Sequence, residues 1–247
     1  MKLINTGGKK KAESNEKSKF VLSTDSKFAI VEGYKIARTN LVFSLTTQNS
    51  NCVAVTSWSK GEGKSTATVN LAISFAKMGK RVLLVDTDLR RPNLHNLLKI
   101  SNESGVSDVI GQFNDFSSAV HRDVIPSMDV LTSGAIPPNP SELLASAQFT
   151  ELVNQLKEEY DYVIMDTPPL GVVADTLLLK DYVGGYVLVV REKVTTHGDI
   201  ERALQSIHLA DSKVLGFLKV GCTLRSRGYG YNKYRGGHNY NYTYYYR

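Results

Sequence analysis

Two adjacent stretches decide the fold: the apolar run Cys52-Val53-Ala54-Val55-Thr56-Ser57 and, two residues later, Lys60-Gly61-Glu62-Gly63-Lys64-Ser65-Thr66. The first predicts a buried strand. The second predicts a tight glycine-rich loop that opens a helix running to Met78 and ending at Gly79. The backbone N–H groups of such a loop, together with the positive end of the helix dipole, form a cradle for anions. We therefore expect a polyphosphate to bind at this loop.

Each side chain of the loop has an expected role. Lys64 would reach the β- and γ-phosphates, the Ser65 hydroxyl would bind Mg²⁺, and Thr66 would contact the inner phosphates. The expected nucleotide-binding set is Lys60, Gly61, Glu62, Gly63, Lys64, Ser65 and Thr66. The alternative is a glycine-rich turn that only caps a helix. Trp58 stands where the pattern GxxxxGK[ST] has its first glycine, so this is a variant P-loop.

Acidic residues follow two further apolar runs. Asp86 and Asp88 close the run Val82–Val85, and Asp166 closes the run Tyr162–Met165. The carboxyl ends of parallel strands meet at the edge of the sheet where ligands bind, so these acids are expected beside the phosphates. Mg²⁺ keeps several waters, and Asp166 is expected to hold that hydration shell. The alternative is that such acids form turns or cap helices.

The rest of the chain alternates between apolar runs and helical patterns. Residues 1–24 are expected to be a flexible basic lead-in, and Asp25 and Ser26 to cap a helix that reaches about Leu45. Further strands are expected at Val130–Thr132, Tyr186–Val190 and Val214–Leu218, and helices at about Ser141–Glu159 and Asp199–Leu209. This alternation predicts an α/β fold of the P-loop NTPase type in residues 25–224, with a mainly parallel sheet flanked by helices.

Residues 225–247 have a different composition. They hold eight of the chain's 13 tyrosines and no aliphatic side chain larger than threonine, so a flexible tyrosine-rich tail is expected. The tail carries +5 and residues 1–27 carry +4 of the total charge of +6, so residues 28–224 carry −3. This distribution disfavours nucleic acid as the main partner, although a basic aromatic tail also suits single-stranded nucleic acid.

The sequence also indicates the cellular compartment of the protein. No apolar run of the 247 residues approaches the length of a membrane span, and the N-terminus lacks the apolar region of a secretory signal. We expect a cytoplasmic protein, with Cys52 and Cys222 as reduced core residues.

The three motifs, in this order, resemble those of the bacterial tyrosine kinases of capsule and exopolysaccharide synthesis, of the cytoplasmic Gram-positive type. Trp58–Thr66 is similar to the Walker A motif of that family, Val82–Arg90 to Walker A′ and Val163–Asp166 to Walker B. The resemblance runs from about Ser26 to the C-terminus. It includes Leu131-Thr132-Ser133-Gly134, Pro137-Pro138-Asn139-Pro140 and the terminal tyrosines.

The resemblance implies an ATP- and Mg²⁺-dependent protein-tyrosine autokinase. Its catalytic residues would be Lys64, Asp86 and Asp88. A phenol with a pKa of about 10 needs a base, and Asp86 would be that base or an orienting carboxylate. Asp88 would support the metal beside Ser65 and Asp166 or share the role of base, and Arg90 would contact the transferring phosphate or be solvated. The expected acceptors are Tyr229, Tyr231, Tyr234, Tyr240, Tyr242, Tyr244, Tyr245 and Tyr246.

The resemblance also implies partners. Glu32, Lys35 and Arg38 match the family's self-association pattern ExxRxxR, with lysine in place of the first arginine, and would help close a homo-oligomeric ring. The alternative is a solvated charged helix face. A transmembrane adaptor would recruit the kinase to the inner face of the membrane and activate it, and a cognate tyrosine phosphatase would reverse the reaction.

Two other functions remain open. Partitioning-type ATPases share the variant P-loop, but they carry a signature lysine five residues before the P-loop lysine, where this chain has Ser59 and the neighbouring Lys60. A non-catalytic nucleotide-binding scaffold is the other alternative.

Overall fold

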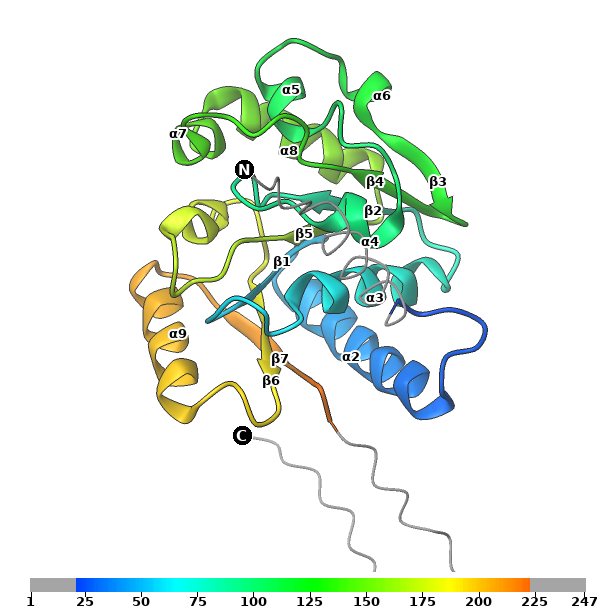
Figure 1. Ribbon diagram of the computed structural model, residues 1–247, viewed down its shortest axis with the longest axis vertical. Coiled ribbons are helices and arrows are strands. Elements are labelled where there is room, and N and C mark those ends of the chain that lie inside the picture. The colour runs from blue at the N-terminus through cyan, green and yellow to red at the C-terminus, as the bar shows by residue number, and fades with distance from the viewer. Residues whose placement is uncertain (1–20, 223–247) are drawn as a thin grey trace, which may run out of the picture.

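The computed structural model describes residues 21–222 and shows a seven-stranded sheet flanked by helices (Figure 1). Most of the expected lead-in and all eight expected acceptor tyrosines lie outside the described residues. The strands are β1 (Cys52–Ser57), β2 (Val82–Asp86), β3 (His121–Ile125), β4 (Met128–Leu131), β5 (Tyr162–Asp166), β6 (Tyr186–Arg191) and β7 (Val214–Val220). They are ordered β3-β4-β2-β5-β1-β6-β7, and all neighbours are parallel except β3 and β4.

Helices cover both faces of this sheet. They are α2 (Phe28–Thr47), α3 (Lys64–Ala76), α4 (Leu94–Leu98), α5 (Val106–Ile110), α6 (Phe116–Ala119), α7 (Pro140–Leu144), α8 (Ala147–Glu159), the 3₁₀ helix η1 (Ala174–Leu179) and α9 (His197–Leu209). The predicted P-loop NTPase fold with a mainly parallel sheet is confirmed.

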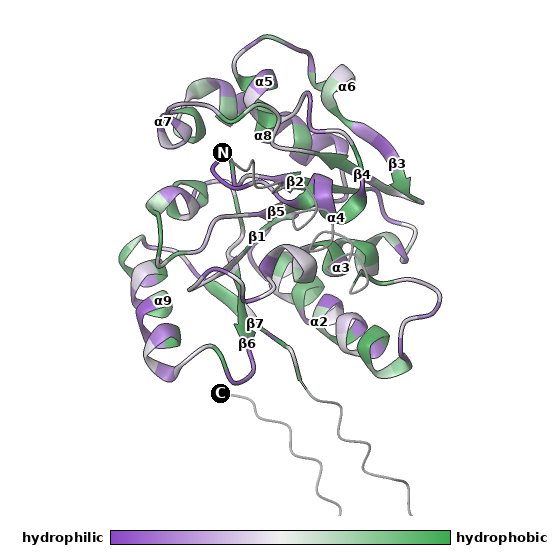
Figure 2. Ribbon diagram, viewed as in Figure 1, coloured by the Kyte–Doolittle hydropathy of each residue, from purple (hydrophilic) through white to green (hydrophobic). Residues whose placement is uncertain are grey.

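The core lies in two layers because successive strand residues face opposite ways. Cys52 and Ala54 pack with residues of α8, whereas Val53 and Val55 pack with residues of α2 and α3. All six residues of β1 are buried, as expected for a central parallel strand covered on both faces. In Figure 2 the ribbon of β6 is correspondingly green for most of its length, whereas the edge strand β3 is largely purple. Burial between the two helix layers fixes the end of β1, and with it the start of the P-loop.

Several predicted helix ends are wrong. Helix α2 begins at Phe28 with Lys27 as its N-cap, and the Ser26 hydroxyl accepts a hydrogen bond from the Ser23 N–H instead of capping α2. Helix α3 ends at Ala76, because the next residues bond three positions back in a tighter turn that closes at Gly79 with φ +72°.

The region predicted as one helix over Ser141–Glu159 is two helices. Ser146 separates α7 from α8, and its hydroxyl accepts a hydrogen bond from the Phe149 N–H, which starts α8 anew. The antiparallel strand β3 and the short helices α4, α5, α6 and η1 were not predicted. The prediction of two core cysteines is half wrong, because Cys52 is buried but Cys222 is exposed. Within residues 21–222, no helix combines the length and apolarity that crossing a bilayer requires.

Candidate nucleotide site

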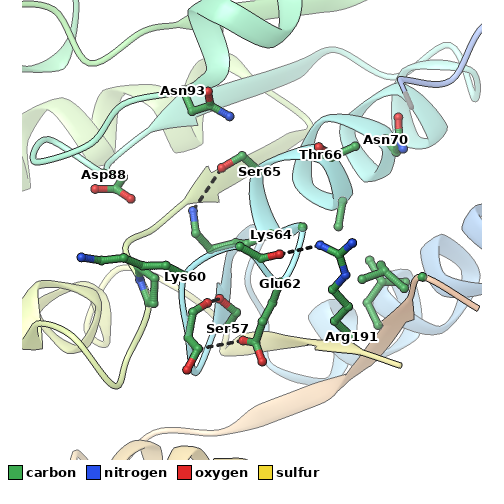
Figure 3. Close-up of a pocket in the computed structure, with 18 of the residues that line it drawn as sticks. Ser57, Lys60, Glu62, Lys64, Ser65, Thr66, Asn70, Asp88, Asn93 and Arg191 are labelled. Atoms are coloured by element: carbon green, nitrogen blue, oxygen red, sulfur yellow. Dashed lines mark hydrogen bonds between the residues drawn. The ribbon is translucent and has the colours of Figure 1, made fainter. Parts of the chain in front are cut away.

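A cavity of about 950 Å³ opens at the carboxyl ends of the central strands, around the P-loop (Figure 3). All seven residues of the expected nucleotide-binding set, Lys60 to Thr66, line it. Segments far from the P-loop in sequence complete the wall: Ala29, Ile30, Gly33 and Tyr34 of α2, Arg90–Asn93 after β2, Pro168–Pro169 after β5 and Leu218–Cys222 at the end of β7. The first two sequence motifs therefore share one cavity, and the third meets it through the contact of Asp166 with Lys64.

The backbone of the P-loop explains its glycines. Gly61 and Gly63 have φ values of +80° and +89°, a region that other residues rarely adopt. Gly63 is the residue before α3, so the helix starts at Lys64 with its free N–H groups directed at the cavity entrance. This backbone has the geometry that an anion cradle requires.

Lys64, which lines the cavity, pairs with the fully buried Asp166, which does not. The Lys64 ammonium lies 2.8 Å from Asp166 Oδ1 and 3.3 Å from the Ser65 hydroxyl. Thr68, one helical turn after Lys64, donates to the same carboxylate oxygen at 3.0 Å. Sequence reasoning did not select Thr68, although its spacing of four residues from Lys64 places it on the same helix face. The ion pair holds the Lys64 ammonium where phosphate oxygens would compete with Asp166 for it.

The residues present fit a Mg²⁺ ion that is held mainly by phosphate and water. Among the described residues, no three acidic, histidine or cysteine side chains form a metal cage. However, Asp166 Oδ2 is buried without a hydrogen-bond partner, and the Ser65 hydroxyl lies on the cavity wall. Since Mg²⁺ takes few direct protein ligands and keeps several waters, an orphaned carboxylate oxygen beside a hydroxyl suits its hydration shell.

Asp86 and Asp88 differ in what they contact. Asp86 is fully buried, and its Oδ2 accepts hydrogen bonds from the N–H groups of Asn93 and Leu94, both at 3.1 Å. Burial, and then the charge of Asp166, raise the pKa of Asp86 to about 7, against the lowering effect of the Leu94 N–H. Asp86 does not line the cavity. Its hydrogen bonds hold the loop after β2 in place.

Asp88 lines the cavity and lies on the same side of the loop as Ser65 (Figure 3). Burial raises the pKa of Asp88, although the nearby Lys64 ammonium lowers it in part. A carboxylate with a raised pKa is a better proton acceptor than an exposed one, and Asp88 is placed where a substrate can reach it.

Arg90 lines the cavity and its side chain is 40% exposed, but its guanidinium is held by partners within the chain. Its guanidinium forms an ion pair with Asp175 of η1 at 2.6 Å and donates to the Ser141 hydroxyl of α7 at 2.9 Å. Hydrogen bonds from Arg90 and Ser141 hold the pKa of Asp175 below its usual range, although burial opposes them. These two partners were missed because nothing in their local sequence marks them. Together they tie the loop after β2 to η1 and α7.

The three residues of the expected self-association motif do not share one free face. Glu32 and Lys35 form an exposed ion pair at 2.6 Å. Arg38 turns toward α3, where its guanidinium donates to the Ser74 carbonyl at 2.7 Å. Arg38 therefore joins α2 to α3 within the chain.

Comparisons with known proteins agree with this site. A family model described as an AAA domain matches residues 50–215. The tyrosine-protein kinase YwqD of Bacillus subtilis is 39% identical over 212 residues, which cover 85% of this chain and 90% of that protein. The kinase domain of the Escherichia coli tyrosine kinase ETK superposes with a TM-score of 0.75 at 31% identity, covering 87% of this chain and 80% of that one.

The chain belongs to the bacterial tyrosine-protein kinase family. This confirms the resemblance and the enzyme class predicted from the motifs. The septum site-determining protein MinD from Pyrococcus horikoshii, complexed with Mg-ADP, also superposes, with a TM-score of 0.57 at 24% identity over 68% of this chain and 69% of that one. That likeness shows the shared fold alone.

Proposed function

We propose that this bacterial tyrosine kinase is an autokinase that uses ATP and Mg²⁺ to phosphorylate its own tyrosines at 229–246, in trans. One observation carries the proposal: Lys64, Ser65 and Asp88 meet in a single cavity in a member of this family. The chain supplies its own acceptors, since eight tyrosines follow the folded region within 25 residues. Residues 25–224 would be the kinase domain and residues 225–247 its substrate.

The geometry suggests how the residues divide the work. The P-loop N–H groups and Lys64 would bind the phosphates, and Mg²⁺, when bound through Ser65 and the water held by Asp166, neutralises charge on them. The tyrosine oxygen forms a bond to the γ-phosphorus as the bond to the bridging β–γ oxygen breaks and ADP leaves. Asp88 would accept the phenolic proton, because it faces the cavity whereas Asp86 is occupied by backbone N–H groups.

The proposal includes partners and a cellular role. By likeness to its relatives, the kinase would act in capsule or exopolysaccharide synthesis and export. A transmembrane adaptor would recruit it to the inner face of the membrane and a tyrosine phosphatase would reset it. A homo-oligomeric ring would present each tail to a neighbouring site. The Glu32–Lys35 pair is exposed and available to such a ring, whereas Arg38 would first have to leave Ser74.

Phosphosite mass spectrometry after incubation with ATP and Mg²⁺ tests the proposal. We expect phosphate on tyrosines 229–246 in the wild type and none in Lys64→Ala. The exposed Lys80→Ala is the matched control and should behave as the wild type. ATP turnover without phosphotyrosine, with or without an adaptor tail, would contradict the autokinase and favour a partitioning-type ATPase. Nucleotide binding without turnover would favour a scaffold.

A further inference from the structure

The segment from the end of β6 to α9 contacts the P-loop at three places, and we call these contacts the P-loop clamp. They join Arg191 to Gly61, Thr195 to Glu62 and Arg202 to Trp58. All three partners lie in one short loop, yet the residues that hold them come from more than 120 positions further along the chain. Neither Thr195 nor Arg202 lines the cavity. Thr195 and Arg202 therefore act on a ligand only through the loop, whereas Arg191 also lines the cavity.

Glu62 is the centre of the clamp. It is only 1% exposed, and a buried carboxylate requires hydrogen bonds to both oxygens. Oε2 accepts from the Ser59 N–H at 2.8 Å, and Oε1 accepts from the Thr195 hydroxyl. That hydroxyl in turn accepts a hydrogen bond from the Arg191 N–H at 2.8 Å. Thr195 therefore links the backbone at the end of β6 to Glu62 of the P-loop. Figure 3 shows the Glu62 carboxylate on the side of the loop away from Ser65 and Asp88.

Arg191 fixes the orientation of one P-loop peptide. Its Nη1 donates to the Gly61 carbonyl at 2.6 Å (Figure 3). In a trans peptide the carbonyl and the following N–H point in opposite directions. Holding the Gly61 oxygen toward Arg191 therefore turns the Glu62 N–H to the opposite side of the loop, where it can serve an anion.

Trp58, which replaces the usual first glycine, is held from outside. The Arg202 guanidinium lies 5.3 Å from the centre of the Trp58 ring, and Arg202 is itself paired with Asp199 at 2.7 Å. On the other side a Cβ at Gly171 would come within 2.7 Å of the ring. The bulky residue at the start of the loop is thus packed in place between α9 and the loop after β5.

We propose that Thr195 is a positioning residue for nucleotide binding, which together with Arg191 and Arg202 holds the P-loop ready for phosphate before the nucleotide arrives. A loop that is already ordered loses less conformational entropy when it binds, so clamping it raises affinity. The inference rests only on the nucleotide-binding part of the proposed function. It requires no transfer to tyrosine.

Titration of the full chain with Mg-ADP, by calorimetry or a fluorescent ADP analogue, tests the clamp. Thr195→Val keeps the side-chain volume and removes the hydroxyl, and we expect it to weaken binding about tenfold, as loss of one hydrogen bond to a charged group would. Thr195→Ser should restore the affinity. In the kinase assay the KM for ATP should rise with kcat nearly unchanged. Thr47→Val, at an exposed threonine of α2, is the matched control.

A folded Thr195→Val variant whose affinity for Mg-ADP is within twofold of wild type would overturn the proposal, even if its melting temperature falls. Arg202→Met provides an independent variant should Thr195→Val not fold, because it keeps the apolar stem and removes the cation above Trp58. It should weaken Mg-ADP binding at least threefold, and unchanged binding there would also count against the clamp. Because the readout is nucleotide affinity, both results can be read whether or not tyrosine is phosphorylated.

Discussion

Asp88 and Asp86 are two residues apart, yet their carboxylates have different surroundings. Burial raises the pKa of both, but Asp88 lines the cavity and accepts one backbone hydrogen bond, from Arg91, whereas Asp86 lies outside the lining and accepts three, from Asn93, Leu94 and Asp88. Strand alternation would place both on one face, but β2 ends at Asp86, so the course of the following loop decides which of them meets a ligand. At the scale of single residues, these two acids make different predictions.

Asp88→Asn should lower kcat for tyrosine phosphorylation by about 10²–10³-fold, because the amide cannot accept the phenolic proton. The initial rate of phosphotyrosine formation at saturating ATP measures this effect. Asp115→Asn, at an exposed acid, is the control.

Asp86→Asn completes the comparison. It should chiefly lower the free energy of unfolding, by about 1–3 kcal/mol, because an amide cannot accept all the N–H bonds that Asp86 accepts. Loss of kcat in Asp86→Asn at unchanged stability would return the role of base to Asp86.

At the scale of elements, the hairpin of β3 and β4 depends on one carboxylate. Asp129 accepts hydrogen bonds from Arg122 at 2.8 Å and from the Tyr160 hydroxyl at 2.6 Å, which ties the hairpin to the end of α8. Burial favours the neutral form, but these bonds and one from the Asp123 N–H outweigh it and lower the pKa of Asp129. The group therefore stabilises the fold above its unfolded pKa of about 4 and loses this effect as pH falls through the lower folded value.

Asp129→Asn should remove that part of the acid dependence. Urea unfolding of the wild type and the variant should differ by about 1 kcal/mol at pH 6 and converge as the pH falls from about 4 through the lowered folded pKa of Asp129. A difference that stays constant across this range would show that the charge of Asp129 does not stabilise the hairpin.

The sequence predicted the strands better than the helices, for a physical reason. Strands β1 and β2 are buried on both faces, so their apolar runs mark their bounds almost to the residue. Strand β3 escaped prediction because its sequence, His121–Ile125, is mainly polar and lies half-exposed at the sheet edge. The α7–α8 break escaped because the Ser146 cap signal sits inside a continuous helical pattern.

The residues of the candidate site also include some that the sequence predicts and some that it does not. Lys64 and the acids were predictable because contiguous motifs carry them. Asp175, Ser141 and Thr195 were not, since they reach the site only through tertiary contacts across 34 to 133 positions of sequence. A local pattern carries no information about such partners.

At the scale of the whole molecule, nucleotide should stabilise the fold by mass action. Mg-ADP at about 100 times its Kd should add about 2.7 kcal/mol to the free energy of unfolding, or about 5–10 °C in melting temperature for a domain of this size. Differential scanning fluorimetry measures the shift. Lys64→Ala should lose most of it, and chelating Mg²⁺ with EDTA should reduce it. An equal shift in Lys64→Ala would place the nucleotide outside the P-loop.

The strand order has a consequence for the order in which the chain is synthesised. Strand β1 pairs only with β5 and β6, through contacts such as Val53 with Ile164 and Val55 with Val187. One edge of β1 therefore stays unpaired until β5 has left the ribosome, more than 100 residues later, and the other until β6 has, more than 130 residues later. Such distant pairings slow folding, and an unpaired apolar strand invites aggregation. Truncated chains that end before β5 should bind chaperones during translation, and release should follow completion of β6.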